Sequence, residues 1–198
     1  MIRVKICGIT RPEDAVAAEA AGADAVGLIF AARSKRRVTT EQAREASEAL
    51  GPFIARVGVF VDWPLPELLA VAREARLTTV QLHGSEPDGY AAAVARHYPV
   101  LVARKVVPGL SLALPPVGTP LVDGPEPGSG EAFAWDEFDR APLAGRAWVL
   151  AGGLTPKNVS QAVRALRPWG VDVASGVESA PGIKDHQKVQ DFITAARG

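Results

Sequence analysis

Eight short apolar runs, separated by alanine-rich segments of helical character, constrain the fold of this chain more than any other feature. Each run is rich in Val, Ile, Leu or Phe, and no Pro/Ser-rich linker interrupts the series. This alternation is typical of a parallel sheet whose strands are joined by crossover helices. The strands are predicted at 2–7, 24–30, 55–61, 78–82, 99–105, 119–123, 147–151 and 171–174.

Helices are predicted between most of these strands. They are expected at 12–21, 40–50, 65–75, 87–97, 156–167 and 187–197. Their start signals are two capping boxes and one N-cap followed by proline: Thr10 with Glu13, Thr39 with Gln42, and Thr155 before Pro156. The segments 108–118 and 124–140 are rich in Pro and Gly, so helices there should be short or irregular.

The position of the glycines distinguishes two parallel-sheet architectures. An open doubly wound sheet usually carries its glycine-rich phosphate loop after the first strand. Here glycine-rich loops follow the last two strands, which is the usual phosphate site of an eight-stranded α/β barrel. We therefore predict a single (β/α)8 TIM-barrel domain spanning residues 1–198, trimmed relative to the roughly 250 residues of a typical barrel.

The composition excludes several classes of protein. Lys plus Arg and Asp plus Glu each number 22, so no net charge favours nucleic acid or an anionic membrane. No apolar run approaches the roughly 20 residues that span a bilayer, and the single Cys indicates a reducing cytoplasm. Three dispersed His residues give no zinc-site spacing, and no dinucleotide fingerprint or P-loop is present. We expect a soluble cytoplasmic protein with a small-molecule substrate and neither metal nor cofactor.

Cys7 and Asp123 are the candidate proton-transfer residues. They end the first and sixth predicted strands, which lie three places apart in a closed ring, so both side chains should face one barrel mouth. A proton acceptor opposite a donor is the arrangement an isomerase needs. The helix N-terminus after Cys7 should favour its thiolate, and partial burial should keep Asp123 protonated. The structural alternatives are a buried apolar cysteine and an aspartate that caps a turn.

The glycine-rich loops after the last two strands are candidate phosphate sites. Glycines let backbone amides approach an anion closely, and a helix N-terminus adds a favourable dipole. The residues expected to contact the phosphate are Gly152, Gly153, Ser175, Gly176 and Val177. One glycine pair alone would be ordinary turn chemistry, but two pairs after adjacent terminal strands favour an anion site.

Three further side chains are candidate substrate ligands. Arg36, in the loop after the second strand, could clamp a carboxylate in bidentate fashion, although most basic runs of this kind are solvated surface. Gln81 and His83 follow strand alternation and should point the same way at the barrel mouth. For His83 a structural hydrogen bond is an equally good interpretation.

The chain resembles the phosphoribosylanthranilate isomerase family of tryptophan biosynthesis over essentially its whole length. The resemblance rests on the order and spacing of Lys5-Ile6-Cys7-Gly8-Ile9-Thr10, Gly22-Ala23-Asp24-Ala25-Val26-Gly27, Ser34-Lys35-Arg36, Val80-Gln81-Leu82-His83-Gly84, Asp123 with Gly128-Ser129-Gly130 and Phe133-Ala134-Trp135, Gly152-Gly153-Leu154 and Ser175-Gly176-Val177-Glu178. It implies an α/β barrel without metal or organic cofactor. It also allows a homodimer, since some relatives pair and others are monomers.

The resemblance implies conversion of the aminoaldose N-(5-phosphoribosyl)anthranilate into the aminoketose 1-(2-carboxyphenylamino)-1-deoxyribulose 5-phosphate. Asp123 would protonate the furanose oxygen, Cys7 would remove the proton from the sugar C2, and Arg36 would hold the anthranilate carboxylate. Two alternatives stay open at this point. The matching isomerase of histidine biosynthesis would want an Asp where Cys7 stands, and a noncatalytic phosphosugar-binding barrel would leave the opposed Cys7 and Asp123 unexplained.

Overall fold

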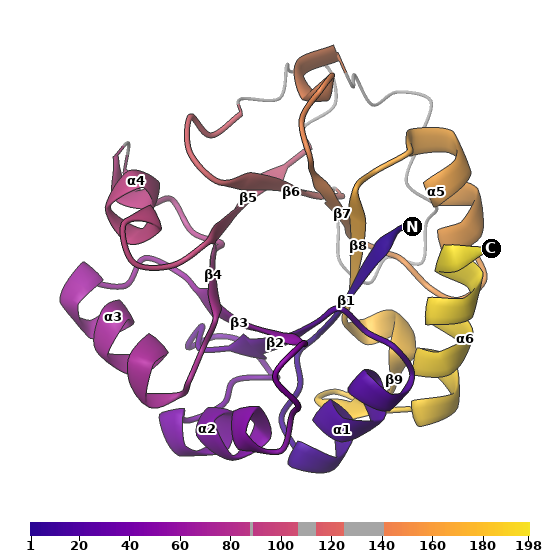
Figure 1. Cartoon of the computed structure of the whole chain (residues 1–198), viewed down its shortest axis with the longest axis horizontal. Helices are drawn as coiled ribbons and strands as arrows, with labels where there is room; N and C mark the ends of the chain where they lie inside the picture. The colour runs from indigo at the N-terminus through magenta and orange to yellow at the C-terminus, as the bar shows by residue number, and fades with distance from the viewer. Residues whose placement is uncertain (88, 107–113, 125–140) are drawn as a thin grey trace.

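Eight parallel strands close into a barrel in chain order (Figure 1). The computed structural model describes residues 1–87, 89–106, 114–124 and 141–198. The strands are β1 Arg3–Cys7, β2 Ala25–Ile29, β3 Ala55–Phe60, β4 Thr79–Leu82, β5 Val100–Lys105, β6 Thr119–Asp123, β7 Val149–Ala151 and β8 Gly170–Val173. The predicted TIM barrel and all eight predicted strands are confirmed, with bounds shifted by one or two residues at most ends.

Helices surround the ring of strands in Figure 1. They are α1 Pro12–Ala20, α2 Thr40–Glu48, α3 Leu65–Glu74, α4 Tyr90–Ala95, α5 Val159–Leu166 and α6 His186–Arg197, with 3-10 helices η2 Ala141–Leu143 and η3 Ser175–Val177. In the described part of the chain, none of these helices is long and apolar enough to cross a membrane. Most of the two Pro/Gly-rich segments lies outside the described residues, as do the motifs at 128–130 and 133–135.

One of the two predicted capping boxes is present. The Thr39 hydroxyl accepts from the Gln42 backbone N–H at 3.1 Å, and the Gln42 side chain accepts from the Thr39 N–H at 2.9 Å. The prediction for Thr10 is wrong, because α1 has Arg11 at its N-cap and no side-chain cap. The Thr10 hydroxyl instead donates to the Gly182 carbonyl at 2.5 Å, a contact between distant parts of the chain.

The start of α5 also differs from the prediction. The helix begins at Val159, three residues after the expected first position, and its N-cap is Asn158 rather than Thr155. The Asn158 side chain accepts from the Thr155 N–H at 2.8 Å and donates to the Gly153 carbonyl at 3.0 Å. This side chain therefore stabilises a turn between the glycine loop and the helix. Asn is common in such turns because its side chain bonds to nearby backbone groups, and it is less favourable in helix interiors.

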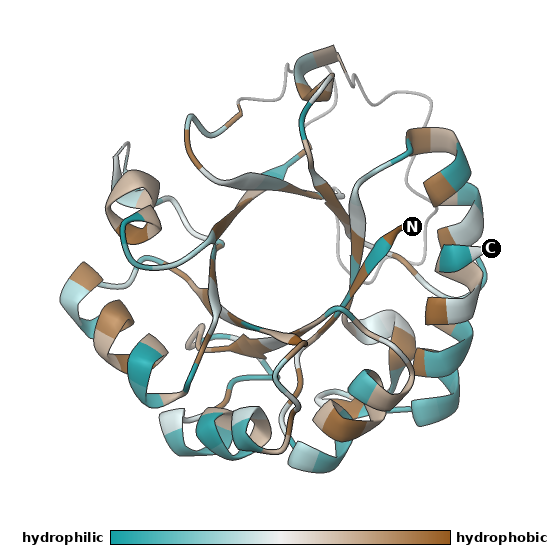
Figure 2. Ribbon diagram, in the orientation of Figure 1, coloured by the Kyte–Doolittle hydropathy of each residue, from teal (hydrophilic) through white to brown (hydrophobic). Residues whose placement is uncertain are grey.

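Alternation along the strands sorts side chains into two layers. The outward layer packs under the helices and forms the main core; it includes Val4, Ile6, Val26, Leu28, Val80, Leu82, Val102, Val122, Leu150 and Val173, all almost fully buried. Each such side chain contributes about 2 kcal/mol by leaving water. Figure 2 shows mostly hydrophobic strands, with hydrophilic residues on the outer faces of the helices. The inward layer is mixed, with small, apolar and charged residues, and it makes room for a cavity.

A short antiparallel hairpin follows β8 and was not predicted. Its strands are β9 Glu178–Ala180 and β10 Ile183–Lys184, and Gly182 supplies the positive φ of 82° that the turn between them requires. The hairpin places Lys184 next to Glu178, with the ammonium 2.9 Å from a carboxylate oxygen. Both side chains lie beside the barrel mouth, so this small element helps to build the site.

Candidate active site

A cavity of about 320 Å³ opens where the carboxyl ends of the strands meet. Cys7 at the end of β1 and Asp123 at the end of β6 both line it. Cys7 and Asp123 are only 6 % and 8 % exposed, as expected for residues that line the inner part of a pocket. The two predicted proton-transfer groups therefore share one cavity although 116 positions separate them in the sequence.

Asp123, His83 and Gln81 form a row along one side of this cavity. His83 Nε2 lies 3.6 Å from Asp123 Oδ2, and Gln81 Nε2 lies 3.0 Å from His83 Nδ1. Gln81 is 1 % exposed, and its Oε1 has no hydrogen-bond partner in the described part of the protein. A buried acceptor at a cavity wall favours a ligand that brings a donor, because leaving it unpaired costs about 1–3 kcal/mol.

Arg36 lines the cavity with its guanidinium already held by a carboxylate. Its Nε and Nη2 donate to the two oxygens of Glu178 at 2.7 Å each, and Lys184 donates to the same carboxylate. Burial works to raise the pKa of Glu178, but its hydrogen bonds to Arg36 and Lys184 hold that pKa below its ordinary value. The guanidinium has five N–H groups, so this pairing orients it without using all of its donors.

Gly8 makes room for the side chain of Arg36. A Cβ at Gly8 would stand 2.5 Å from Arg36 Cδ. Its φ of 76° is also unfavourable for any other residue. Gly8 therefore gives passage to the Arg36 side chain, which crosses it to reach the cavity.

Lys5 and Asp172 form an ion pair inside the barrel that the sequence reasoning missed. Lys5 Nζ donates to Asp172 Oδ1 at 2.9 Å, and the two side chains are 5 % and 9 % exposed. The β1–β8 register pairs these two residues directly. A strand alternation argument could have placed Lys5 on the same face as Cys7, two residues later, but it gave no partner for the ammonium.

The thiol of Cys7 does not have the environment that was predicted for it. Burial raises the pKa of Cys7 above the ordinary value for a thiol, Lys5 opposes the shift, and Asp172 adds to it. The sequence had predicted a thiolate favoured by the following helix N-terminus. In the structure the largest influence on the Cys7 pKa is burial, which favours the neutral thiol.

The predicted phosphate loops reach the cavity in part. Gly152, Gly153 and Ser175 line it, and η3 starts at Ser175 with first-turn amides that have no partner inside the helix. Gly176 is instead required by packing, since a Cβ there would stand 2.0 Å from the Leu154 carbonyl oxygen. Val177 is completely buried. Three of the five predicted phosphate residues therefore line the cavity.

These features define a class of protein: a TIM barrel whose cavity at the carboxyl ends of the strands is lined by a thiol, a carboxyl group and two glycine-containing loops. The profile of one family, described as N-(5'phosphoribosyl)anthranilate (PRA) isomerase, matches residues 4–195. The chain belongs to this family. The predicted resemblance, the isomerase class and the main predicted function are thereby confirmed.

Individual relatives agree over the full length of the chain. The N-(5'-phosphoribosyl)anthranilate isomerase of Deinococcus radiodurans is 47% identical over 203 residues, covering 99% of this chain and 97% of that one. The crystal structure of the Thermotoga maritima enzyme is 41% identical with a TM-score of 0.90, and both chains are fully covered. A second structure, at 39% identity with full coverage and a TM-score of 0.87, holds reduced 1-(o-carboxyphenylamino)-1-deoxyribulose 5-phosphate.

Proposed function

We propose that this chain carries out the isomerisation of N-(5'-phosphoribosyl)anthranilate in tryptophan biosynthesis with Cys7 as general base and Asp123 as general acid. The observation that carries these roles is that both groups, from β1 and β6, line one cavity of about 320 Å³. A thiol and a carboxyl on opposite strands can act on two atoms of one sugar, the ring oxygen and C2.

The proposed reaction moves protons without any net gain or loss. Asp123 gives a proton to the furanose oxygen, and the ring opens to a protonated Schiff base as the C1–O bond breaks. Cys7, as thiolate, takes the proton from C2, and the C2 electron pair forms the double bond of an enolamine. The enolamine tautomerises to the ketone, and the proton on the Cys7 sulfur is released in exchange for the one Asp123 lost.

In our proposal both ends of the substrate have partners in the cavity. The ligand of the relative described above carries a carboxyphenyl group at one end and a phosphate at the other. In our proposal the carboxylate binds the free N–H groups of Arg36, and Gln81 with His83 positions the sugar. The phosphate binds at the loops that contain Gly152, Gly153, Ser175, Gly176 and Val177. The free energy of phosphate binding there offsets the entropic cost of orienting the reacting carbons.

The roles of the acid and the base are tested by removing one proton-transfer group at a time. We expect Cys7→Ser and Asp123→Asn each to lower kcat by about 10²–10⁴-fold, because general acid–base catalysis contributes that much. The measurement is fluorescence-monitored turnover of freshly made substrate, with circular dichroism to establish folding. Asp191→Asn, at an exposed site on α6, is the matched carboxylate control. Near-normal turnover in either active-site variant would refute its assigned role.

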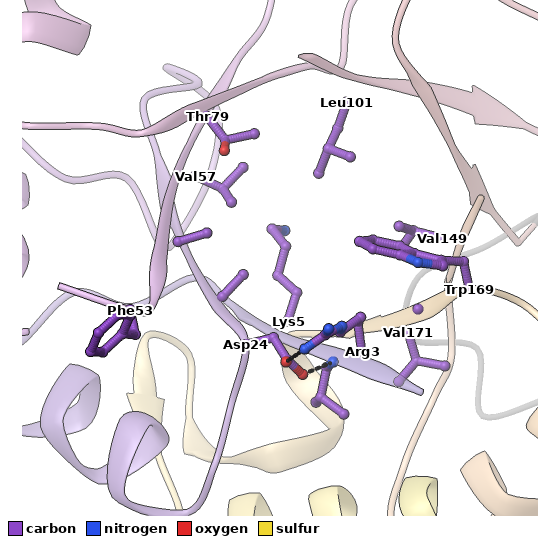
Figure 3. Close-up of a pocket in the computed structure, with 14 residues that line it drawn as sticks. Arg3, Lys5, Asp24, Phe53, Val57, Thr79, Leu101, Val149, Trp169 and Val171 are labelled. Atoms are coloured by element: carbon purple, nitrogen blue, oxygen red, sulfur yellow. Dashed lines mark hydrogen bonds and ion pairs between the residues drawn. The ribbon is translucent and has the colours of Figure 1, made fainter. Parts of the chain in front are cut away.

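We also propose that the chain forms a homodimer through the opposite pole of the barrel. A second cavity, of about 330 Å³, lies at the amino ends of the strands (Figure 3). Its walls are largely apolar, with Val57, Leu101, Val149 and Val171, and Trp169 is half exposed beside them. Phe53, in the loop before β3, borders this cavity and is 98 % exposed.

A projecting aromatic ring beside an apolar hollow on the same pole is complementary to a second copy of itself. In a two-fold arrangement each Phe53 would enter the cavity of the partner, and both contacts would form at once. Burial of a phenyl ring contributes about 2 kcal/mol, so two such rings supply a substantial anchor. Support also comes from a solved structure of monomers generated from the dimeric Thermotoga maritima enzyme, 38% identical over both full lengths with a TM-score of 0.86.

We place this activity in the cytoplasm and expect no nucleic-acid or membrane partner. The single Cys and the balanced charge of the chain support this placement. A substrate that is a charged small molecule of central metabolism fits the same compartment.

A further inference from the structure

Two buried ion networks flank the Cys7 thiol. One is the pair of Lys5 and Asp172 inside the barrel, with Nζ and Oδ1 2.9 Å apart. The other joins Arg36, Glu178 and Lys184, and its lysine side chain is wholly buried with its Nζ 3.1 Å from the Ala174 carbonyl. Burying this many charges costs free energy, because each one must be desolvated.

Gly27 fixes how closely the first network approaches the sulfur. A Cβ placed on Gly27 would stand 2.7 Å from Cys7 Sγ and 3.1 Å from Lys5 Nζ. The sulfur and the ammonium therefore border the same small space beside β2. Glycine at this position leaves them without an intervening side chain, so their charges act on each other through a low-dielectric interior.

Basic and acidic groups both lie around the thiol. Lys5, Arg36 and Lys184 belong to the two networks with Asp172 and Glu178, and Asp123 and His83 line the same cavity as Cys7. Burial lowers the pKa of Lys184, and its hydrogen bond to Glu178 opposes that shift. Of the pair beside the sulfur, the Lys5 ammonium favours the thiolate and the Asp172 carboxylate disfavours it.

We infer that Lys5 and Asp172 are positioning residues that set the proton affinity of the Cys7 sulfur with opposite sign. Lys5 stabilises the thiolate, and Asp172 limits this effect by pairing with the ammonium from the other side. The importance of this pair for catalysis rests on the proposed role of Cys7 as the base. The influence of the pair on the thiol is independent of that role, because this influence can be measured without substrate.

Asp172 and Cys7 also influence the lysine itself. Burial lowers the pKa of Lys5, but Asp172 first and Cys7 second raise it above its ordinary value, so Lys5 stays charged at neutral pH. A charged ammonium held at a fixed position stabilises negative charge on the sulfur at neutral pH. A purely structural ion pair would instead hold β1 against β8 and would not change the proton affinity of the thiol.

The test is the pH dependence of Cys7 alkylation by iodoacetamide. Cys7 is the only cysteine of the chain, so no other thiol contributes to the rate. The thiolate is the reactive form, and the midpoint of the rate against pH reports proton affinity, while the plateau at high pH reports access. We expect Lys5→Met to move the midpoint to higher pH and to slow alkylation at pH 7.5 by about tenfold, the usual scale for one neighbouring charge.

The second variant must change the midpoint in the other direction. Asp172→Asn leaves Lys5 with the sulfur as its anionic partner, so the midpoint should fall and alkylation at the same pH should become about tenfold faster. Lys5→Arg, which retains the positive charge, should restore most of the wild-type midpoint. Arg3→Met, on the same strand but paired with Asp24 at the far pole, is the matched control and should leave the midpoint unchanged.

Opposite shifts from two halves of one ion pair distinguish this inference from a structural role. Loss of a structural pair would affect both variants in the same direction or would change only stability. Midpoints that are unchanged, or that move together, overturn the inference. If Lys5→Met does not fold, Asp172→Asn decides alone, because only a lowered midpoint agrees with the proposed sign.

The same variants separate this inference from the proposed function. A shifted alkylation midpoint with an unshifted pH profile of kcat/KM would retain the Lys5 effect and reject Cys7 as the base. A profile that follows the alkylation midpoint supports both. Unaltered alkylation with a shifted profile would reject the inference and leave the catalytic role of Cys7 standing.

Discussion

Glu178 shows how one carboxylate can organise a cavity wall. It receives two hydrogen bonds from Arg36 and one from Lys184, and its own side chain is 5 % exposed. Without it, two cations would face each other across a buried space. The orientation of Arg36 toward the cavity therefore depends on a residue 142 positions away in the sequence.

We predict that Glu178→Gln destabilises the protein by roughly 3 kcal/mol at pH 7, because it leaves a buried cation without its partner. The pKa of Glu178 is depressed in the folded state, so its stabilisation is present above the unfolded pKa and is lost as pH falls through the folded pKa. The stability gap between wild type and variant should therefore shrink in acid. Urea unfolding at a series of pH values measures it.

Glu67→Gln on α3 serves as the control for this prediction, because Glu67 is exposed. It should change the free energy of unfolding by less than about 0.5 kcal/mol at any pH. A gap between wild type and Glu178→Gln that stays constant as pH falls well below the ordinary carboxyl pKa would show that the charge of Glu178 contributes nothing.

The sequence located the residues with chemical groups at strand ends but not the charges that surround them. Cys7, Arg36, Gln81, His83 and Asp123 were all predicted, and all line the cavity. The ion-pair partners were missed. Such a pair depends on which residues the β1–β8 register and the small hairpin bring together, and separation along the chain gives no sign of it.

Local capping signals in this chain had mixed success. The Thr39 capping box formed because both of its partners lie within α2 and its N-cap, and nothing competes for them. At Thr10 a carbonyl from the hairpin took the hydroxyl instead. At Thr155 the backbone N–H donates to the Asn158 side chain, and the helix begins only after Asn158. A cap is predictable from sequence only when tertiary neighbours leave its groups free.

We predict that Thr39→Ala lowers the free energy of unfolding by about 1 kcal/mol, the usual value of an N-cap hydroxyl. Thr40→Ala, one position later and inside the helix, is the matched control, since it removes the same atoms without removing the cap. Urea unfolding of both variants under one set of conditions gives the comparison. Equal losses would mean that the cap of α2 contributes nothing of its own.

At the scale of the whole molecule the two poles of the barrel have different character. The carboxyl ends of the strands carry the charged and polar cavity, whereas the amino ends carry an apolar hollow with Phe53 beside it (Figure 3). In our proposals the polar pole serves catalysis and the apolar pole serves association. The Arg3–Asp24 ion pair, with atoms 2.7 Å apart, lies at the edge of the apolar pole.

We predict that Phe53→Ser converts the proposed dimer into a monomer at micromolar protein concentration, because it removes the aromatic anchor from both sides of a two-fold interface. Val16→Ser, at an exposed apolar site on α1, is the control and should leave the dimer intact. Sedimentation equilibrium measures both, and turnover should persist in the monomer. A wild-type protein that sediments as a monomer would reject the proposed dimer.

The amino-acid sequence by itself determined the barrel, because strand and helix periodicity, strand number and the position of the glycines are all local patterns that the hydrophobic effect acts on directly. It also determined which strand ends carry the thiol and the carboxyl group, and which loop carries the guanidinium. Only the tertiary structure decided the proton affinity around Cys7, the partner of Arg36 and the packing role of Gly8. Those depend on distances in space between residues that lie far apart in the sequence, 142 positions for Arg36 and Glu178 and 167 for Lys5 and Asp172, and electrostatic energy follows distance and burial.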